Sequence, residues 1–126
     1  MNYLLKTEPT AYSFEELVQE KETDWTGVTN PQAVKNLAAM KKGDKLVIYH
    51  TGDEKSAVGL AHVKSVDLSN PKVPLVRIAA GAAITRPKTL AEIKQQQIFQ
   101  ASPLVRQSRL SVVPLDEAQY DWILHN

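Results

Sequence analysis

The sequence contains no cysteine. Disulfide bonds, thiolate metal sites and a cysteine nucleophile are therefore excluded, and a reducing compartment fits best, so we expect the protein in the cytoplasm or at the nucleoid. No run of about 18 apolar residues is present, so we expect no membrane span. Residues 1–6, MNYLLK, lack the basic region and cleavage site of a signal peptide.

Common catalytic and metal-binding motifs are also missing. There is no G-x-S-x-G elbow, P-loop or G-x-G-x-x-G fingerprint. The three histidines, His50, His62 and His125, do not have the spacing of zinc ligands. We therefore expect no metal, no cofactor and no enzymatic activity. Were the protein an enzyme, Glu8 or His50 would be its general base; otherwise Glu8 is a surface carboxylate before a turn and His50 a hydrogen-bonded histidine at a strand end.

Charge is nearly balanced overall but unevenly distributed, with a net charge of +1. Residues 41–109 hold 12 Lys or Arg against 5 Asp or Glu, whereas residues 1–40 hold 3 against 6 and residues 110–126 hold none against 3. A basic middle between acidic ends is compatible with a phosphate-binding surface. Lysines spread along a chain also simply solvate a surface, so this pattern alone leaves both interpretations open.

What is present suits one compact domain over residues 1–126, because 43% of the residues are apolar and can form a core. We predict strands at residues 3–8, 44–50, 56–66, 73–79 and 110–113, and helices at residues 14–20, 31–41, 90–97 and after Asp116. The strand at 44–50 is apolar on both faces and should be central. Strands separated by short helices indicate the α+β class, with a small mixed or antiparallel, partly closed β-barrel.

Local signals mark the ends of these elements. Ser13 and Glu16 form a capping box, with Tyr12 and Leu17 at the flanking staple positions, and a second box lies at residues 89–92. The helix at 31–41 should face the core with Val34, Leu37 and Ala38. It should end before Gly43, which suits the C′ position.

Other segments carry weaker signals. Residues 21–24 are predicted to form a charged loop, and Pro114 should end the last strand. Gly59, inside the strand at 56–66, indicates a bulge or a close approach of another group. Residues 79–83, which are rich in alanine, fit a strand end, a loop or a tight turn.

The stretch WTGVTNP at residues 25–31 has two interpretations. Trp25 offers a flat stacking surface, and Asn30 carries an amide that can read the polar edge of a base. Alternatively, Trp25 is a core residue, while Asn30 and Pro31 are the N-cap and the N1 residue of a helix.

Seven pieces of the sequence together match one pattern, in chain order: YLLKTEP at 3–9, YS at 12–13, WTGVTN at 25–30, MKKGD at 40–44, YHT at 49–51, GLA at 59–61 and QSRLSV at 107–112. In this combination the chain resembles the EVE domain family over nearly its whole length. The resemblance implies a PUA-like fold, a twisted, partly closed mixed β-barrel flanked by short helices and related to YTH domains. The chain departs from the family in having Thr29 where Arg is commoner and no tryptophan near Val73, so the second aromatic wall is unassigned.

The resemblance further implies a module that binds DNA or RNA carrying a modified base, methylated or otherwise substituted, in an aromatic pocket. Trp25 would be a wall of that pocket. Other residues expected in or near it are Lys6, Ser13, Asn30, Tyr49, His50, Gln107 and Ser108. Basic residues outside it would bind phosphates, namely Arg106, Arg109, Lys41 and Lys42. We expect a monomer; the alternatives are a sensor of a free modified nucleoside and an enzyme that acts on a nucleotide.

Overall fold

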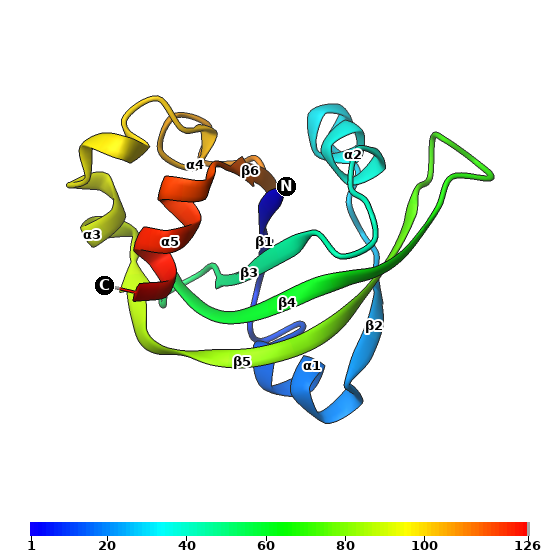
Figure 1. Cartoon of the computed structure of the whole chain (residues 1–126), viewed down its shortest axis with the longest axis horizontal. Helices are drawn as coiled ribbons and strands as arrows, with labels where there is room; N and C mark the ends of the chain where they lie inside the picture. Colours follow the sequence, from blue (N-terminus) through cyan, green and yellow to red (C-terminus); the bar gives the residue numbers. More distant parts are fainter. Residues whose placement is uncertain (126) are drawn as a thin grey trace.

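The computed structural model describes residues 1–125 and confirms the α+β class (Figure 1). Within these residues six strands form one sheet: β1 (Asn2–Thr7), β2 (Glu22–Trp25), β3 (Lys45–His50), β4 (Ser56–Asp67), β5 (Leu75–Thr89) and β6 (Val112–Leu115). The helices are α1 (Phe14–Glu20), α2 (Pro31–Ala38), α3 (Leu90–Lys94), α4 (Pro103–Arg106) and α5 (Glu117–His125), with a 3-10 turn η1 at Gln97–Phe99. None of these helices is long and apolar enough to cross a membrane.

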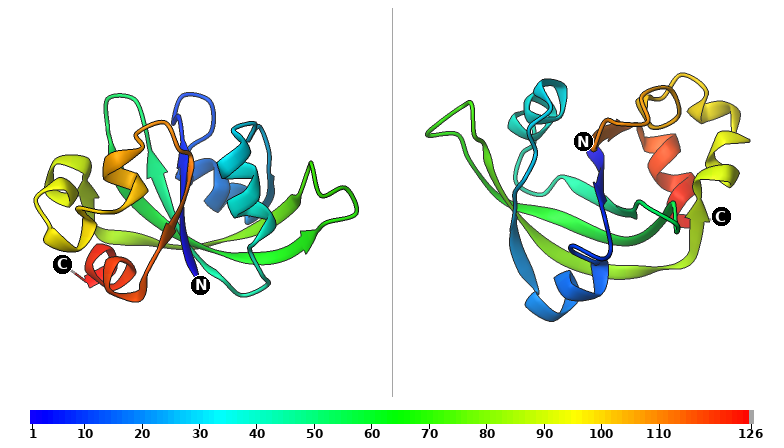
Figure 2. Two further views of the ribbon diagram at one scale, coloured as in Figure 1. Left: turned by 90° about the horizontal axis from the view of Figure 1, so that it is seen from above. Right: turned by 180° about the vertical axis from the view of Figure 1, so that it is seen from behind.

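The sheet has the strand order β2-β5-β4-β3-β1-β6 and is strongly curved (Figure 2). β1 pairs with β3 in parallel, and all other neighbours are antiparallel. Within residues 1–125 the edge strands β2 and β6 do not pair with each other, so the sheet stays open between them. α2 lies against β6 at this opening, where the Asn36 side-chain amide donates to the backbone oxygen of Val112 at 2.8 Å.

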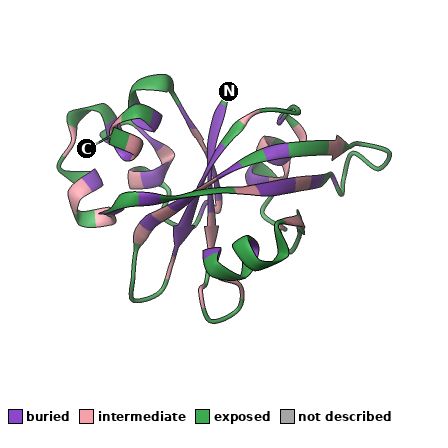
Figure 3. Cartoon of the chain, turned by 60° about the horizontal axis from the view of Figure 1, so that its bottom comes forward, coloured by how far each residue is buried: buried purple, intermediate pink, exposed green. Residues whose placement is uncertain are grey.

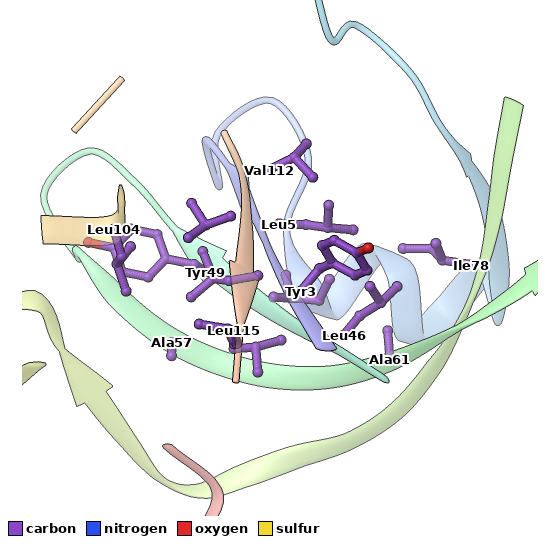
Figure 4. Close-up of a cluster of buried hydrophobic side chains, with 14 of the residues drawn as sticks. Tyr3, Leu5, Leu46, Tyr49, Ala57, Ala61, Ile78, Leu104, Val112 and Leu115 are labelled. Atoms are coloured by element: carbon purple, nitrogen blue, oxygen red, sulfur yellow. The ribbon is translucent and has the colours of Figure 1, made fainter. Parts of the chain in front are cut away.

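The apolar core lies inside the curve of the sheet and under the helices (Figures 3 and 4). Figure 4 shows Tyr3, Leu5, Leu46 and Ile78 gathered on the concave side. β3 is buried at every position after its first residue, which confirms the predicted central strand. The core therefore holds β1 and β3 side by side and fixes where their C-terminal ends emerge.

The predicted loop at 21–24 was wrong, and the assignment left open for residues 79–83 is decided, because both segments pair with strands elsewhere in the sequence. The predicted loop at 21–24 is largely strand β2, which pairs with β5 in the register Trp25↔Val76. Its two acidic side chains form ion pairs across the sheet with Arg77, which donates to Glu22 at 3.1 Å and to Asp24 at 3.2 Å. β5 also continues through the alanine-rich piece to Thr89, because β4 supplies hydrogen-bonding partners along its length.

The ends of several helices and strands differ from the predicted ends for local reasons. α2 stops at Ala38, because the Asp44 carboxylate accepts the backbone N–H of Lys41 at 2.9 Å and turns the chain toward β3. Gly43 is therefore not the C′ residue; its φ of 91° serves that turn. Pro114 lies inside β6, as an edge strand permits.

Further end predictions need correction. α3 ends at Lys94, and α4, which was not predicted, begins at Pro103 after the N-cap Ser102. In α2, Leu37 is buried as predicted, whereas Val34 and Ala38 are only half-buried. The other buried positions at this helix and just after it are Ala33 and Met40.

Candidate ligand-binding site

A cavity of about 360 Å³ lies in the opening of the sheet, between edge strand β2 and the C-terminal end of β1. We call it the edge cavity. It is lined by Lys6, Thr7, Glu8, Tyr12, Thr23, Asp24, Trp25, Thr26, Gly27, Val28 and Ser111. Its volume lies at the lower end of the range of about 300–1,000 Å³ that is typical of small-molecule sites. Hydroxyl groups, charged groups and aromatic rings share its wall, so it can make both stacking and hydrogen-bonding contacts.

Two aromatic rings meet at this cavity. Trp25, the last residue of β2, is 8% exposed and belongs to the core. Tyr12 is more exposed and contacts Trp25 edge to face, with the ring centres 6.1 Å apart and the planes at 78°. The Tyr12 hydroxyl donates to the Glu20 carboxylate. Burial, and then this hydrogen bond, raise the pKa of Tyr12 to about 12, so its phenol stays neutral at physiological pH.

The turn between β1 and α1 holds Tyr12 in place. The backbone N–H of Tyr12 donates to the backbone oxygen of Glu8 at 2.9 Å, and its backbone oxygen accepts from the Thr7 hydroxyl at 2.6 Å. The Glu8 carboxylate in turn accepts from the hydroxyls of Thr10 at 3.2 Å and Thr51 at 3.3 Å. The wall of the cavity is therefore tied to the β3–β4 turn.

Lys6 is the basic residue of the cavity wall. Its ammonium donates to the backbone oxygen of Ser108 at 2.9 Å and lies 5.8 Å from the centre of the Tyr49 ring. Within residues 1–125 no carboxylate forms a salt bridge with it. Burial lowers the pKa of Lys6, as expected for an ammonium that is partly removed from water.

A second hollow of about 340 Å³ lies beside the edge cavity; we call it the arginine hollow. It is lined by Asn30, Gln32, Arg106, Gln107, Ser108, Arg109 and Leu110. Asn30 caps α2 here, its side-chain oxygen accepting the N–H groups of Gln32 at 2.9 Å and Ala33 at 3.1 Å. Ser108 connects the two hollows, because it lines one and bonds to Lys6 of the other.

The residues predicted for the site divide into three groups. Trp25 and Lys6 line the edge cavity. The arginine hollow brings together five others, namely Asn30, Arg106, Gln107, Ser108 and Arg109. Neither hollow includes Ser13, Tyr49, His50, Lys41 or Lys42.

The residues of this last group lie elsewhere in the fold. Ser13 caps α1, and Tyr49 is buried beneath Lys6. Lys41 and Lys42 precede β3 at the opposite end of β1 from the cavity, because Lys45 pairs with Asn2.

His50 is 2% exposed and has a partner on each ring nitrogen. Its Nε2 atom accepts the backbone N–H of Phe14 at 3.0 Å, which assigns the proton to Nδ1, 3.0 Å from the Glu54 carboxylate. Neither His50 nor Glu54 lines the edge cavity, so this pair does not form a general base at the site. Among residues 1–125, no group of three His, Cys, Asp or Glu side chains is arranged to hold a metal ion.

Sequence reasoning missed most of the cavity wall. Tyr12 was assigned to a staple position, Thr23 to the predicted loop at 21–24 and Ser111 to the predicted strand at 110–113, and none of the three was named as a site residue. The one usable signal for Tyr12 was its position just before a capping box, where an aromatic ring lies at a helix entry. The remaining lining residues come together only through the long-range pairing of β1, β2 and β6.

A curved mixed sheet with short helices and a cavity at its open edge defines a PUA-like domain. The sequence matches the EVE domain family over residues 1–126, and the chain belongs to that family.

Human thymocyte nuclear protein 1 is 28% identical over 162 residues, covering 98% of this chain and 72% of that protein. A crystal structure of an Agrobacterium tumefaciens protein has a TM-score of 0.90 with 32% identity, covering 98% of this chain and 90% of that chain. The human THYN1 protein in complex with DNA containing 5-methylcytosine has a TM-score of 0.83 with 29% identity, covering 98% and 95%.

Proposed function

We propose that this chain is a non-enzymatic DNA-binding module that takes a single modified base into the edge cavity. The observation that carries the proposal is the aromatic cavity, which adjoins a hollow with two arginines and whose wall includes Lys6, a lysine in no salt bridge among residues 1–125. The EVE relative crystallised with 5-methylcytosine DNA supports the choice of partner.

The chemistry of the two hollows matches the two parts of a nucleotide. An extruded base needs a flat slot with hydrogen-bonding groups at its edge, and the edge cavity offers Tyr12, Trp25 and the hydroxyls of Thr23, Thr26 and Ser111. The flanking phosphates need cations outside the slot. Arg106 and Arg109 in the arginine hollow, together with Lys6 between the two hollows, supply them.

The two alternatives fit less well. A sensor for a free nucleoside would have no use for a basic hollow beside its pocket. An enzyme would need a base or nucleophile at the cavity, and the buried pair of His50 and Glu54 lies outside it. Glu8 does line the cavity, but its carboxylate is engaged by the hydroxyls of Thr10 and Thr51.

The test is fluorescence anisotropy with duplexes of one sequence that differ in a single base: cytosine, 5-methylcytosine, adenine or N6-methyladenine. We expect one modified duplex to bind more tightly than its unmodified partner, and binding to weaken as salt rises. Arg109→Gln should reduce the slope of log K against log salt by about 0.9, the contribution of one phosphate contact. Lys42→Gln, at the opposite end of β1, is the matched control and should leave the slope unchanged.

Three other outcomes would overturn the proposal. Equal affinity for all duplexes would show that the protein does not recognise a modified base. Binding of free nucleosides with no dependence on salt would favour the sensor. Chemical conversion of the oligonucleotide, detected by mass spectrometry, would show that the protein is an enzyme.

A further inference from the structure

The two rings of the edge cavity differ in how much surface they can offer to a ligand. Trp25 is 8% exposed. Aromatic side chains have areas of about 150–250 Å², so the accessible part of this indole is about 20 Å² at most. That is much less than one face of the ring. A base therefore cannot stack on Trp25 in this arrangement, although Trp25 contributes to the wall.

Tyr12 has the properties that Trp25 lacks. It is only half-buried, and it lines the edge cavity. It is also held at three points, because its N–H and its backbone oxygen bond within the turn and its hydroxyl bonds to Glu20. A ring that is already immobilised loses little further freedom when a ligand stacks on it, which favours binding.

We propose, resting on the proposed function, that Tyr12 is the residue on which the captured base stacks, and that Trp25 is the ring that supports it. The angle of 78° between the two rings makes this geometry favourable. A base that lies parallel to Tyr12 is nearly perpendicular to Trp25. It therefore makes an offset stack with one ring and an edge-to-face contact with the other, the two arrangements that aromatic pairs prefer.

The assignment separates the roles of the two residues in binding. Tyr12 acts on the ligand directly, and Trp25 acts through the position of Tyr12 and the packing of the core. Removing the Tyr12 ring should therefore lower affinity without changing the core. Replacing the Trp25 indole with a smaller aromatic ring should chiefly change stability.

The experiment compares Tyr12→Leu, Tyr12→Phe and Trp25→Phe with the unmodified protein, on the duplex that it prefers. Tyr12→Leu should lose about 5- to 100-fold in affinity, which corresponds to the ~1–3 kcal/mol of one base–aromatic stack. Tyr12→Phe keeps the ring and should keep most of the affinity, although it loses the bond to Glu20. Trp25→Phe keeps an aromatic ring for the edge-to-face contact, so at a temperature below its melting transition it should lose less affinity than Tyr12→Leu.

A fluorescence measurement gives a readout that does not depend on how the Tyr12 and Trp25 variants fold. In a Trp122→Phe background, Trp25 is the one remaining tryptophan of the sequence. Direct stacking of a base on its indole would quench its emission almost completely, whereas an edge contact should change it only modestly. We expect a modest change on saturation with duplex.

The result that would overturn the assignment is strong quenching of Trp25, or a larger loss of affinity for Trp25→Phe than for Tyr12→Leu. Failure of the proposed function is distinct from this, because the unmodified protein would then bind no modified duplex preferentially. If Tyr12→Leu lowers the melting temperature, Tyr12→His, which retains a flat ring, should restore binding. Failure of Tyr12→His to bind while folded would also contradict the stacking role.

Discussion

At the scale of single residues, Phe14 anchors helix α1 to the sheet in two ways. Its backbone N–H donates to buried His50, and its ring lies directly over Gly59 of β4. A Cβ atom at Gly59 would be 2.2 Å from the Phe14 ring, a distance that real Cβ contacts do not reach. The absence of a side chain at this position is therefore what allows the helix entry, with the neighbouring Tyr12, to approach the sheet closely.

We expect Gly59→Ala to lower the free energy of unfolding by about 1–3 kcal/mol, because the new methyl group overpacks the core. Urea unfolding would measure the change. The control is a double-mutant cycle: in a Phe14→Leu background, which removes the ring, the same substitution should cost clearly less. An equal cost in both backgrounds would assign the effect to the backbone of β4 rather than to the ring.

At the scale of elements, α2 closes the opening of the curved sheet without adding a strand to it. Its N-terminus, capped by Asn30, lies at the arginine hollow, and further along it Asn36 bonds to the edge of β6. The partial positive charge of a helix N-terminus favours a phosphate at this position. The cap residue is therefore placed where both the stability of α2 and the proposed binding of DNA can be tested.

Three substitutions at Asn30 separate those two roles. Asn30→Ala should lower stability by about 0.5–2 kcal/mol, because the N–H groups of Gln32 and Ala33 lose their acceptor. Asn30→Ser and Asn30→Asp should both preserve the cap. Only the aspartate should weaken DNA binding, since it places a negative charge beside Arg106 and Arg109. The measurements are melting temperature and duplex affinity at low salt. Unchanged affinity for the aspartate variant would show that no phosphate binds in the arginine hollow.

At the scale of the whole molecule, the buried phenols make stability sensitive to alkaline pH. Burial raises the pKa of Tyr49 to about 12, and Tyr12 has a similar value. Because the unfolded-state pKa is about 10, these groups stabilise the fold fully below pH 10 and lose that contribution as pH rises through 12. Burial lowers the pKa of Lys6 and of Lys88. Each of these side chains therefore contributes stability above about pH 10.5, and that contribution is lost as pH falls.

We therefore expect the free energy of unfolding to fall between about pH 10 and 12, with Tyr49 alone contributing about 2 kcal/mol of the decline. Urea unfolding at several pH values in this range would measure the decline. Tyr49→Phe, which cannot ionise, should lose less stability over the same interval than the unmodified protein. The same decline in both proteins would exclude Tyr49 as its source.

Features that depend on a few neighbouring residues could be predicted from the sequence. The capping boxes at Ser13 and Thr89, the central strand β3 and the close approach at Gly59 all follow from short-range spacing or local composition. Strand β2 could not be predicted, because its four residues are mostly polar and form a strand only where β5 pairs with them. Tyr12 was predicted only at a helix entry, because the cavity wall that it joins forms only when β2 and Ser111 come together in the fold.

Short windows of the sequence are enough to specify the α+β class, the family and the importance of the stretch around Trp25, because periodicity, capping and motif order are local properties. Which residues share a site follows from the folded structure alone. It joined Lys6, Tyr12, Trp25 and Ser111 from separate segments and left Lys41 at the other end of β1. The physical reason is that register between distant strands depends on the packing of the whole core, and no short window of sequence contains that information.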